Sequence, residues 1–203
     1  MRALFLNATL KPSPAPSSTA ELNAHVAQQL SAFGVDVEHV RLADLDIAFG
    51  VQSDAVRDGD AWPQVREKVL AADIVVFGSP TWLGQPSSVV KQALERMDAL
   101  ISETTADGTP VCFNKVAGVI VVGNEDGAHH VIAEIAQAAI DLGFTIPGQA
   151  WTYWNKGPGP GEEEYRTSED REWTHSTGEA MAHVLFHTAT ALAQHPIPKP
   201  PNA

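Results

Sequence analysis

Strand-sized apolar segments alternate with amphipathic segments along the 203 residues, and this alternation constrains the fold more than any other feature. Residues 74–77 and 116–122 are continuous apolar runs, which are typical of strands covered on both faces. Further strands are expected at residues 3–6, at residues 35–40 and within residues 144–153. Because strands that alternate with helices form parallel sheets, the sequence predicts an open, doubly wound α/β sheet with helices on both faces.

Residues that are typical of helix starts follow two of the predicted strands. Ser18 and Glu21 form a capping box that predicts the start of the first helix, and Pro86 is expected to open the helix after the third strand. The chain has the length of one domain, which we expect to span residues 1–195. Residues 196–203 are rich in proline and are expected to form a flexible C-terminal tail.

Charge and composition limit the classes of partner. Thirteen basic and 25 acidic residues give a net charge of −12, which argues against binding of nucleic acid or of an anionic membrane surface. The single cysteine, Cys112, excludes an intramolecular disulfide framework. No apolar run reaches the roughly 18–20 residues that span a bilayer, and the N-terminus does not resemble a signal peptide. We therefore expect a soluble, cytoplasmic protein.

Ligands of open α/β sheets bind outside the carboxyl ends of the strands, so three loops are candidates for the site. These loops span residues 7–18, 79–86 and 123–128. The first contains no glycine, which excludes a dinucleotide-binding G-x-G-x-x-G turn, and no P-loop motif is present. The acidic residues that a phosphorylated receiver domain needs after its first and third strands are missing as well.

Hydroxyl side chains crowd the first loop just before the predicted helix. They belong to Thr9, Ser13, Ser17, Ser18 and Thr19. Free amides and hydroxyls at the positive end of a helix dipole bind terminal phosphates. The alternative is that Ser18 only caps the helix, and both interpretations can hold, because a phosphate would use the same donors.

An aromatic side chain stands at the end of the third strand. Trp82 lies at the expected rim of the sheet, and Gly84 allows backbone to approach a ligand closely. An indole beside backbone amides suits a flat heteroaromatic ring. The alternative is a tryptophan of the core or of an interface.

Three segments of the sequence together resemble one known family. Residues 7–10 and 17–22 have the sequences N-A-T-L and S-S-T-x-x-L, and residues 79–91 have the sequence S-P-T-W-L-G-x-P-S-S-x-x-K. They resemble the flavodoxin-like NAD(P)H-dependent FMN reductases, and the resemblance covers about residues 2–145. Residues 123–127, G-N-E-D-G, resemble the third flavin-contacting loop of one branch of that family.

The resemblance implies a three-layer flavodoxin-like sandwich whose five-stranded parallel sheet has the order 2-1-3-4-5. It also implies FMN as cofactor and NADPH or NADH as electron donor. The implied FMN contacts are Thr9, Ser17, Ser18 and Thr19 at the phosphate, Pro80, Thr81, Trp82, Leu83 and Gly84 at the isoalloxazine, and Gly123, Asn124 and Gly127 at its pyrimidine side. Glu125 belongs to the same loop, where its charge either tunes the flavin or stabilises a helix N-terminus.

The sequence therefore predicts an enzyme that takes a hydride from a nicotinamide onto FMN and passes electrons to a flavin, a quinone or another small acceptor. The chemistry resides on FMN, positioned by Trp82, Leu83 and Gly84, and no catalytic side chain is predicted. The alternatives are a flavodoxin-like electron carrier without its own NAD(P)H reductase activity and a non-enzymatic flavin-sensing module. Members of such a family are expected as homodimers or homotetramers.

Other conspicuous residues receive no catalytic role. His183 and His187 have the spacing of metal ligands on a helix, but we interpret them as a solvated helix face and expect no metal site. Cys112 is expected to be inert. Alternation places Trp151 and Tyr153 on one face of the strand, and the aromatic run of Trp151, Tyr153 and Trp154 either covers the site or forms a dimer contact.

Overall fold

The computed structural model describes residues 1–201, which form a three-layer α/β sandwich around a parallel sheet. Its parallel strands run in the order β2-β1-β3-β5-β6. Their bounds are β1 (Arg2–Asn7), β2 (Asp36–Arg41), β3 (Ile74–Trp82), β5 (Val116–Gly123) and β6 (Trp151–Asn155). A short β4 (Gln85–Pro86) pairs antiparallel with the end of β3. Counted without β4, the order is 2-1-3-4-5, so the predicted flavodoxin-like α/β fold is confirmed.

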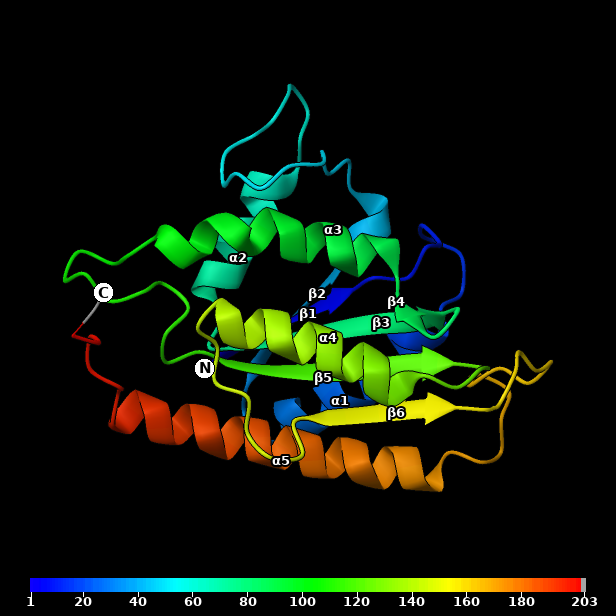
Figure 1. Cartoon of the computed structure of the whole chain (residues 1–203). Helices are drawn as coiled ribbons and strands as arrows, with labels where there is room; N and C mark the ends of the chain where they lie inside the picture. The colour runs from blue at the N-terminus through cyan, green and yellow to red at the C-terminus, as the bar shows by residue number, and fades with distance from the viewer. Residues whose placement is uncertain (202–203) are drawn as a thin grey trace.

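Helices cover both faces of the sheet (Figure 1). On one face lie α1 (Ser18–Ala32) and α5 (Glu172–Gln194), whose apolar side chains share a core with one set of strand residues. On the other lie α2 (Trp62–Ala71), α3 (Ser88–Met97) and α4 (Ala128–Asp141). Two short 3₁₀ segments, η1 (Leu42–Asp44) and η2 (Asp98–Ser102), follow β2 and α3.

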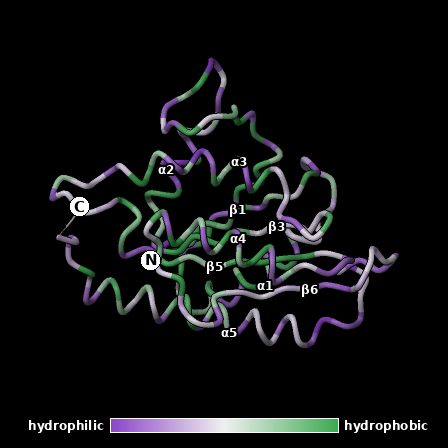
Figure 2. Tube along the Cα trace, viewed as in Figure 1, coloured by the Kyte–Doolittle hydropathy of each residue, from purple (hydrophilic) through white to green (hydrophobic). Residues whose placement is uncertain are grey.

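The central strands are buried on both faces, as their continuous apolar runs predict. Every residue of β5 is buried, and successive side chains of β1 enter opposite cores: Phe5 packs with α1 and α5, and Leu6 packs with α2 and α3. Figure 2 shows the same pattern, with hydrophobic strands inside and hydrophilic loops outside. This rigid centre holds the loops at the carboxyl ends of the strands.

Two helices begin later or earlier than the sequence predicts. Ser17, not Ser18, caps α1, because its backbone is extended and its Oγ accepts from the Ala20 amide at 3.1 Å. Pro86 does not open α3 but lies in β4. The cap of α3 is Ser87, whose Oγ accepts from the Val90 amide at 3.2 Å.

The segment expected as an open loop after the third strand is a β-hairpin. Trp82 pairs with Gln85, and the two residues between them have left-handed backbones, with φ of 54° at Leu83 and 73° at Gly84. Two positive φ values in a two-residue loop are typical of the type I′ turn that matches strand twist. The hairpin therefore projects Trp82 and Leu83 beyond the sheet as an ordered element.

A buried ion pair orders the long connection between β2 and α2. The Arg96 guanidinium donates to Asp60 at 2.7 Å and to the carbonyl oxygens of Ala48, Gln52 and Asp54. Asp60 also accepts from three backbone amides of the same connection and the start of α2, those of Ala48, Val56 and Trp62. Burial raises the pKa of the Asp60 carboxyl, but these hydrogen bonds outweigh it and lower the pKa overall.

The last part of the chain lies against the amino ends of the strands. Of residues 196–203, the structure describes 196–201, and residues 202–203 lie outside the description. Ile197 exchanges two hydrogen bonds with the Asn114 side chain, of 2.7 and 3.2 Å. Between residues 1 and 201, no helix has the length and apolar character needed to cross a membrane.

Candidate functional site

A cavity of about 140 Å³ opens at the carboxyl edge of the sheet, where the three candidate loops meet. The predicted residues that line it are Thr9, Ser17, Ser18, Thr19, Pro80, Thr81, Trp82, Gly123 and Asn124. The fold brings them together because β1, β3 and β5 are neighbours that end at the same edge. Residues 9, 80 and 123, far apart in sequence, therefore face one space.

One end of the cavity offers groups that can hold an anion. Ser17 supplies the cap of α1, so the amides of Ser18 and Thr19 belong to the first turn, where amides have no partner within the helix. The Thr9 amide donates to Asn7 at 3.0 Å, which fixes the loop beside these amides. Lys11 adds a cationic side chain to the lining. Amides, hydroxyls and the helix dipole together favour a phosphate here.

The other end of the cavity offers a free hydroxyl in a close-packed setting. Thr81 is 4% exposed, and its Oγ1 is buried without a hydrogen-bond partner. A Cβ at Gly123 would lie 2.8 Å from Cβ of Thr81, so only glycine fits beside it. Buried polar side-chain atoms without a hydrogen-bond partner occur also at Asn23, Trp62 and Arg66, but these residues do not line the cavity. Thr81 points to a ligand because its unpaired hydroxyl belongs to a residue of the lining.

Four predicted contacts do not line the cavity: Leu83, Gly84, Glu125 and Gly127. The hairpin turn carries Leu83 away from the cavity and leaves it 91% exposed. Gly127 has a φ of 109°, and a Cβ there would lie 2.7 Å from Cα of Gly84. These two glycines therefore let the hairpin pack against the loop before α4. Glu125 stays half-buried on that loop.

A fourth wall closes the cavity, and of its residues the sequence indicated only Trp154. It consists of Trp154, Glu163, Glu164 and Tyr165. The glycine- and proline-rich segment 157–161, which leads into this wall, is tied to the third candidate loop. The Gly161 amide donates to the Asn124 carbonyl at 2.9 Å, and Asn124 Nδ2 donates to the Gly161 carbonyl at 2.6 Å.

The only sequence signal for this wall was strand alternation. Alternation along β6 places Trp151 and Tyr153 on one face, where their rings stack with centroids 5.8 Å apart, and so directs Trp154 to the other face. There Trp154 Nε1 donates to the Asp170 carbonyl at 3.0 Å, which fixes the indole beside the cavity. Of these aromatic residues, Trp154 thus lines the cavity and the stacked pair does not.

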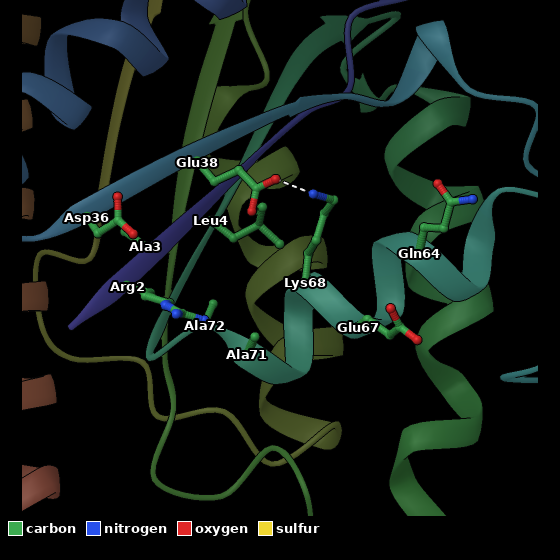
Figure 3. A pocket seen from close by; sticks show the side chains of 10 residues that line it. All are labelled: Arg2, Ala3, Leu4, Asp36, Glu38, Gln64, Glu67, Lys68, Ala71 and Ala72. Carbon is green, nitrogen blue, oxygen red and sulfur yellow. Dashed lines mark hydrogen bonds and ion pairs between the residues drawn. The ribbon is translucent and has the colours of Figure 1, made fainter.

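A larger groove of about 500 Å³ lies at the opposite edge of the sheet (Figure 3). Charged side chains dominate it, and Lys68 on α2 forms an ion pair with Glu38 on β2 across it. It lies at the amino ends of β1 and β2, away from the edge where open α/β sheets bind ligands, and none of the predicted contacts lines it.

Three residues expected to have no catalytic role lie apart from the cavity. Burial raises the pKa of the Cys112 thiol to about 11, so the reactive thiolate is scarce at neutral pH. His183 and His187 are both exposed on α5, with ring centroids 4.3 Å apart.

Comparison with known proteins identifies the family. Residues 1–158 match the model of the NADPH-dependent FMN reductases. The chain belongs to the NADPH-dependent FMN reductase family. The name of this family specifies FMN and NADPH, which agrees with the predicted cofactor and electron donor.

Two curated relatives and one solved structure show the range of this similarity. A Mycobacterium bovis protein named divalent metal cation transporter MntH is 37% identical over 198 residues, which cover 95% of this chain and 29% of that protein. The 8-demethyl-8-aminoriboflavin-5′-phosphate synthase of Streptomyces davaonensis is 36% identical over 172 residues, 79% of this chain and 66% of the synthase. This chain thus spans less than two thirds of each curated relative.

The solved structure is that of RosB with a bound intermediate, 8-demethyl-8-formylriboflavin-5′-phosphate. It superposes with a TM-score of 0.89 at 32% identity, covering 97% of this chain and 82% of RosB.

The residues of the cavity fit FMN. The first turn of α1 offers amides and hydroxyls for one terminal phosphate, and its loop has no glycine-rich path for a pyrophosphate. The free Thr81 hydroxyl can bond a polar atom of the ring, and Gly123 leaves room beside it. Trp82, 52% exposed at the rim, offers a flat surface for the isoalloxazine.

Proposed function

We propose that this protein transfers a hydride from NADPH or NADH to FMN and passes the electrons on to a small acceptor such as a free flavin or a quinone. Membership of the FMN reductase family and the lining of the cavity support this proposal. When bound, FMN supplies the redox chemistry, because its ring system accepts a hydride from the nicotinamide. The protein binds the cofactor, orients its ring and leaves the ring accessible.

Each of these tasks falls to different residues. The amides of Ser18 and Thr19 would hold the phosphate, and the Thr81 hydroxyl would donate to a polar atom of the ring. The Trp82 indole would fix the plane of the ring. Hydride transfer is sensitive to misplacement of about 1 Å, so an ordered hairpin serves this purpose better than a mobile loop.

The main observation behind the proposal is that one cavity combines two kinds of surface. An anion-binding helix terminus lies at one end, and at the other a buried free hydroxyl lies next to a half-exposed indole. The enclosed volume of about 140 Å³ is smaller than the roughly 300–1,000 Å³ of typical ligand pockets. A ligand of FMN size would therefore extend to the open rim at Trp82, where a nicotinamide can reach it.

The proposal extends to organisation and location. Residues 1–195 would act as one FMN-binding domain with residues 196–203 as its tail, assembled as a homodimer or homotetramer in the cytoplasm. Sedimentation equilibrium of the purified protein measures the assembly, and a monomer at all concentrations would contradict that part.

The test is reduction of the FMN-loaded protein without oxygen. Addition of NADPH or NADH should bleach the visible flavin absorbance, and a quinone should restore it. Protein that binds FMN but is not bleached by either nucleotide would contradict the proposal and favour the electron-carrier alternative, in which a partner protein supplies the electrons.

A second candidate follows from one similarity. The Streptomyces davaonensis relative is named as a synthase of an amino-substituted riboflavin phosphate, and the RosB structure holds a formyl-substituted one. The second candidate is therefore an enzyme that modifies the flavin ring itself. Mass spectrometry of the flavin recovered after aerobic turnover separates the two, since a reductase returns FMN with unchanged mass.

A further inference from the structure

The wall residue Tyr165 connects the cavity to two histidines outside it. Its ring lines the cavity and is 1% exposed, and its hydroxyl lies 2.9 Å from Nε2 of His175. Burial raises the pKa of Tyr165 to about 12, so the phenol keeps its proton and acts as donor. Nε2 of His175 can accept that hydrogen bond only while the imidazole is uncharged.

The two histidines stack between the helices that bound the site. The rings of His25 and His175 have centroids 4.1 Å apart and an angle of 17° between their planes. Nε2 of His25 lies 3.3 Å from the His175 carbonyl oxygen. A Cβ at Gly178 would lie 3.3 Å from the His25 ring, so α1 and α5 approach closely here. His25 lies on the helix that begins at the anion-binding end, and His175 lies just after the segment that forms the wall.

The surroundings of His175 disfavour its protonation. Glu21 on α1 and Glu179 on α5 are the facing anions, but Arg171 binds Glu21 at 2.9 Å and lies 5.3 Å over the Tyr165 ring. Burial, followed by the neighbouring His25 and by Arg171, lowers the pKa of His175 below the ordinary histidine value of 6.5. A proton on His175 would also make Nε2 a donor and leave the buried phenol proton without its acceptor.

We propose that His175, stacked against His25, makes flavin binding dependent on protons, with the uncharged His175 imidazole holding Tyr165 in place as a positioning residue of the cavity wall. Protonation of His175 places a charge against the stacked His25 ring and removes the acceptor of Tyr165, so the wall loosens and FMN is released. This inference rests on the proposed function, because its ligand is FMN.

The direction of the effect follows from linkage. The folded wall lowers the pKa of His175, so the folded wall is most stable at pH values at which the imidazole is uncharged. The wall, and FMN with it, should be lost as the pH falls below about 6.5.

The test compares FMN affinity between about pH 7.5 and pH 5.5 in the wild-type protein and three variants. His175→Gln removes the titration and keeps an acceptor for Tyr165, and His25→Gln removes the neighbouring charge. His183→Gln, an exposed histidine of the same helix, is the matched control. Titration of the FMN phosphate itself is common to all four proteins and cancels in the comparison.

Wild-type protein and His183→Gln should lose several-fold, and at most about tenfold, in affinity over this range, beyond the change that His175→Gln shows. In His25→Gln the loss should begin at higher pH, because the pKa of His175 rises without that neighbour. A wild-type profile retained by both His175→Gln and His25→Gln would overturn the inference. Wild-type protein that binds no FMN at about pH 7.5 would instead overturn the proposed function on which the inference rests.

A second measurement needs no flavin and no variant that folds poorly. The ring protons of His175 in the NMR spectrum of the free protein should titrate with a pKa below the ordinary histidine value of 6.5. Titration at or above that value would overturn the inference even if the affinity data were ambiguous.

Discussion

Two polar clusters of this protein are built on opposite plans. Around Arg96 and Asp60, two fully buried side chains of opposite charge share seven hydrogen bonds, and each charged atom has its partner within the chain. Around the cavity, the Thr81 hydroxyl is buried without a partner, and the Ser18 and Thr19 amides in the first turn of α1 have no partner within the helix. Because unpaired buried polar groups cost free energy, a protein tolerates them where a ligand completes them.

The contrast predicts different consequences for substitutions in the two clusters. Changes in the Arg96 cluster should lower the free energy of unfolding and leave flavin binding intact in the molecules that fold. Changes around the cavity should leave unfolding nearly unaffected and weaken flavin binding or its reduction.

The largest effect is expected from Arg96→Met. The substitution leaves the Asp60 charge and three carbonyl groups buried without their partner, which should lower the free energy of unfolding by about 3–5 kcal/mol. Chemical denaturation measures it. Arg57→Met is the control, because its ion pair with Asp46 is exposed and should contribute less than about 1 kcal/mol. Equal effects of the two variants would contradict the structural role of the buried cluster.

The next effect concerns the phosphate. Ser18→Asp places a carboxylate in the first turn of α1, where the helix dipole favours it, so the fold should be kept. Repulsion of the FMN phosphate should weaken FMN binding by about a hundredfold or more and leave riboflavin binding unchanged.

The matched control is Ser88→Asp, at the corresponding position of α3 and outside the cavity lining. It should bind FMN like the wild-type protein. Fluorescence titrations with both flavins give these affinities. Unchanged FMN affinity in Ser18→Asp would place the phosphate elsewhere.

A smaller effect is expected on the rate of reduction. Trp82→Ala removes the indole that fixes the ring, and misplacement of the ring should slow flavin reduction by NADPH by about ten- to a hundredfold. FMN affinity should fall less, because the phosphate is held by another loop. Trp173→Ala, which removes a tryptophan of similar exposure (50% against 52%) outside the lining, is the control and should reduce at the normal rate. Stopped-flow absorbance distinguishes them, and equal rates in the two variants would count against Trp82.

The smallest effect tests the unpaired hydroxyl itself. Thr81→Val removes an oxygen without a partner in the protein, so stability should stay the same or rise slightly, while FMN affinity falls about fivefold. Thr152→Val is the counterpart, because that hydroxyl lies 2.8 Å from the Thr174 carbonyl and 2.7 Å from Thr177. It should cost about 1–2 kcal/mol of stability and leave FMN affinity unchanged. Thermal melts with FMN titrations check both.

Local patterns in the sequence were sufficient to predict the sheet and the positions of the three loops. Apolar runs identify the strands because both faces of a parallel sheet are covered, and strand ends place Thr9, Thr81 and Gly123 at one edge. The cap at Ser17 was missed by one residue, because Ser17 and Ser18 are adjacent residues of the same type.

The remaining features depend on long-range contacts that no local pattern contains. The hairpin turn at Leu83 was hidden because a bulky residue rarely adopts a left-handed backbone. The fourth wall depends on Asn124 binding Gly161, 37 residues away, and on Tyr165 meeting His175 after the last helix has docked. Such pairings follow from the folded arrangement of elements and not from spacing along the chain.

The central claim is that the free donors at the start of α1 belong to the phosphate of FMN. The most direct measurement is a set of titrations of the flavin-free protein with FMN, riboflavin and FAD. The account predicts that FMN binds about a hundredfold or more tighter than riboflavin, which lacks the phosphate, and tighter than FAD. Equal affinities for FMN and riboflavin, or tighter binding of FAD, would contradict it.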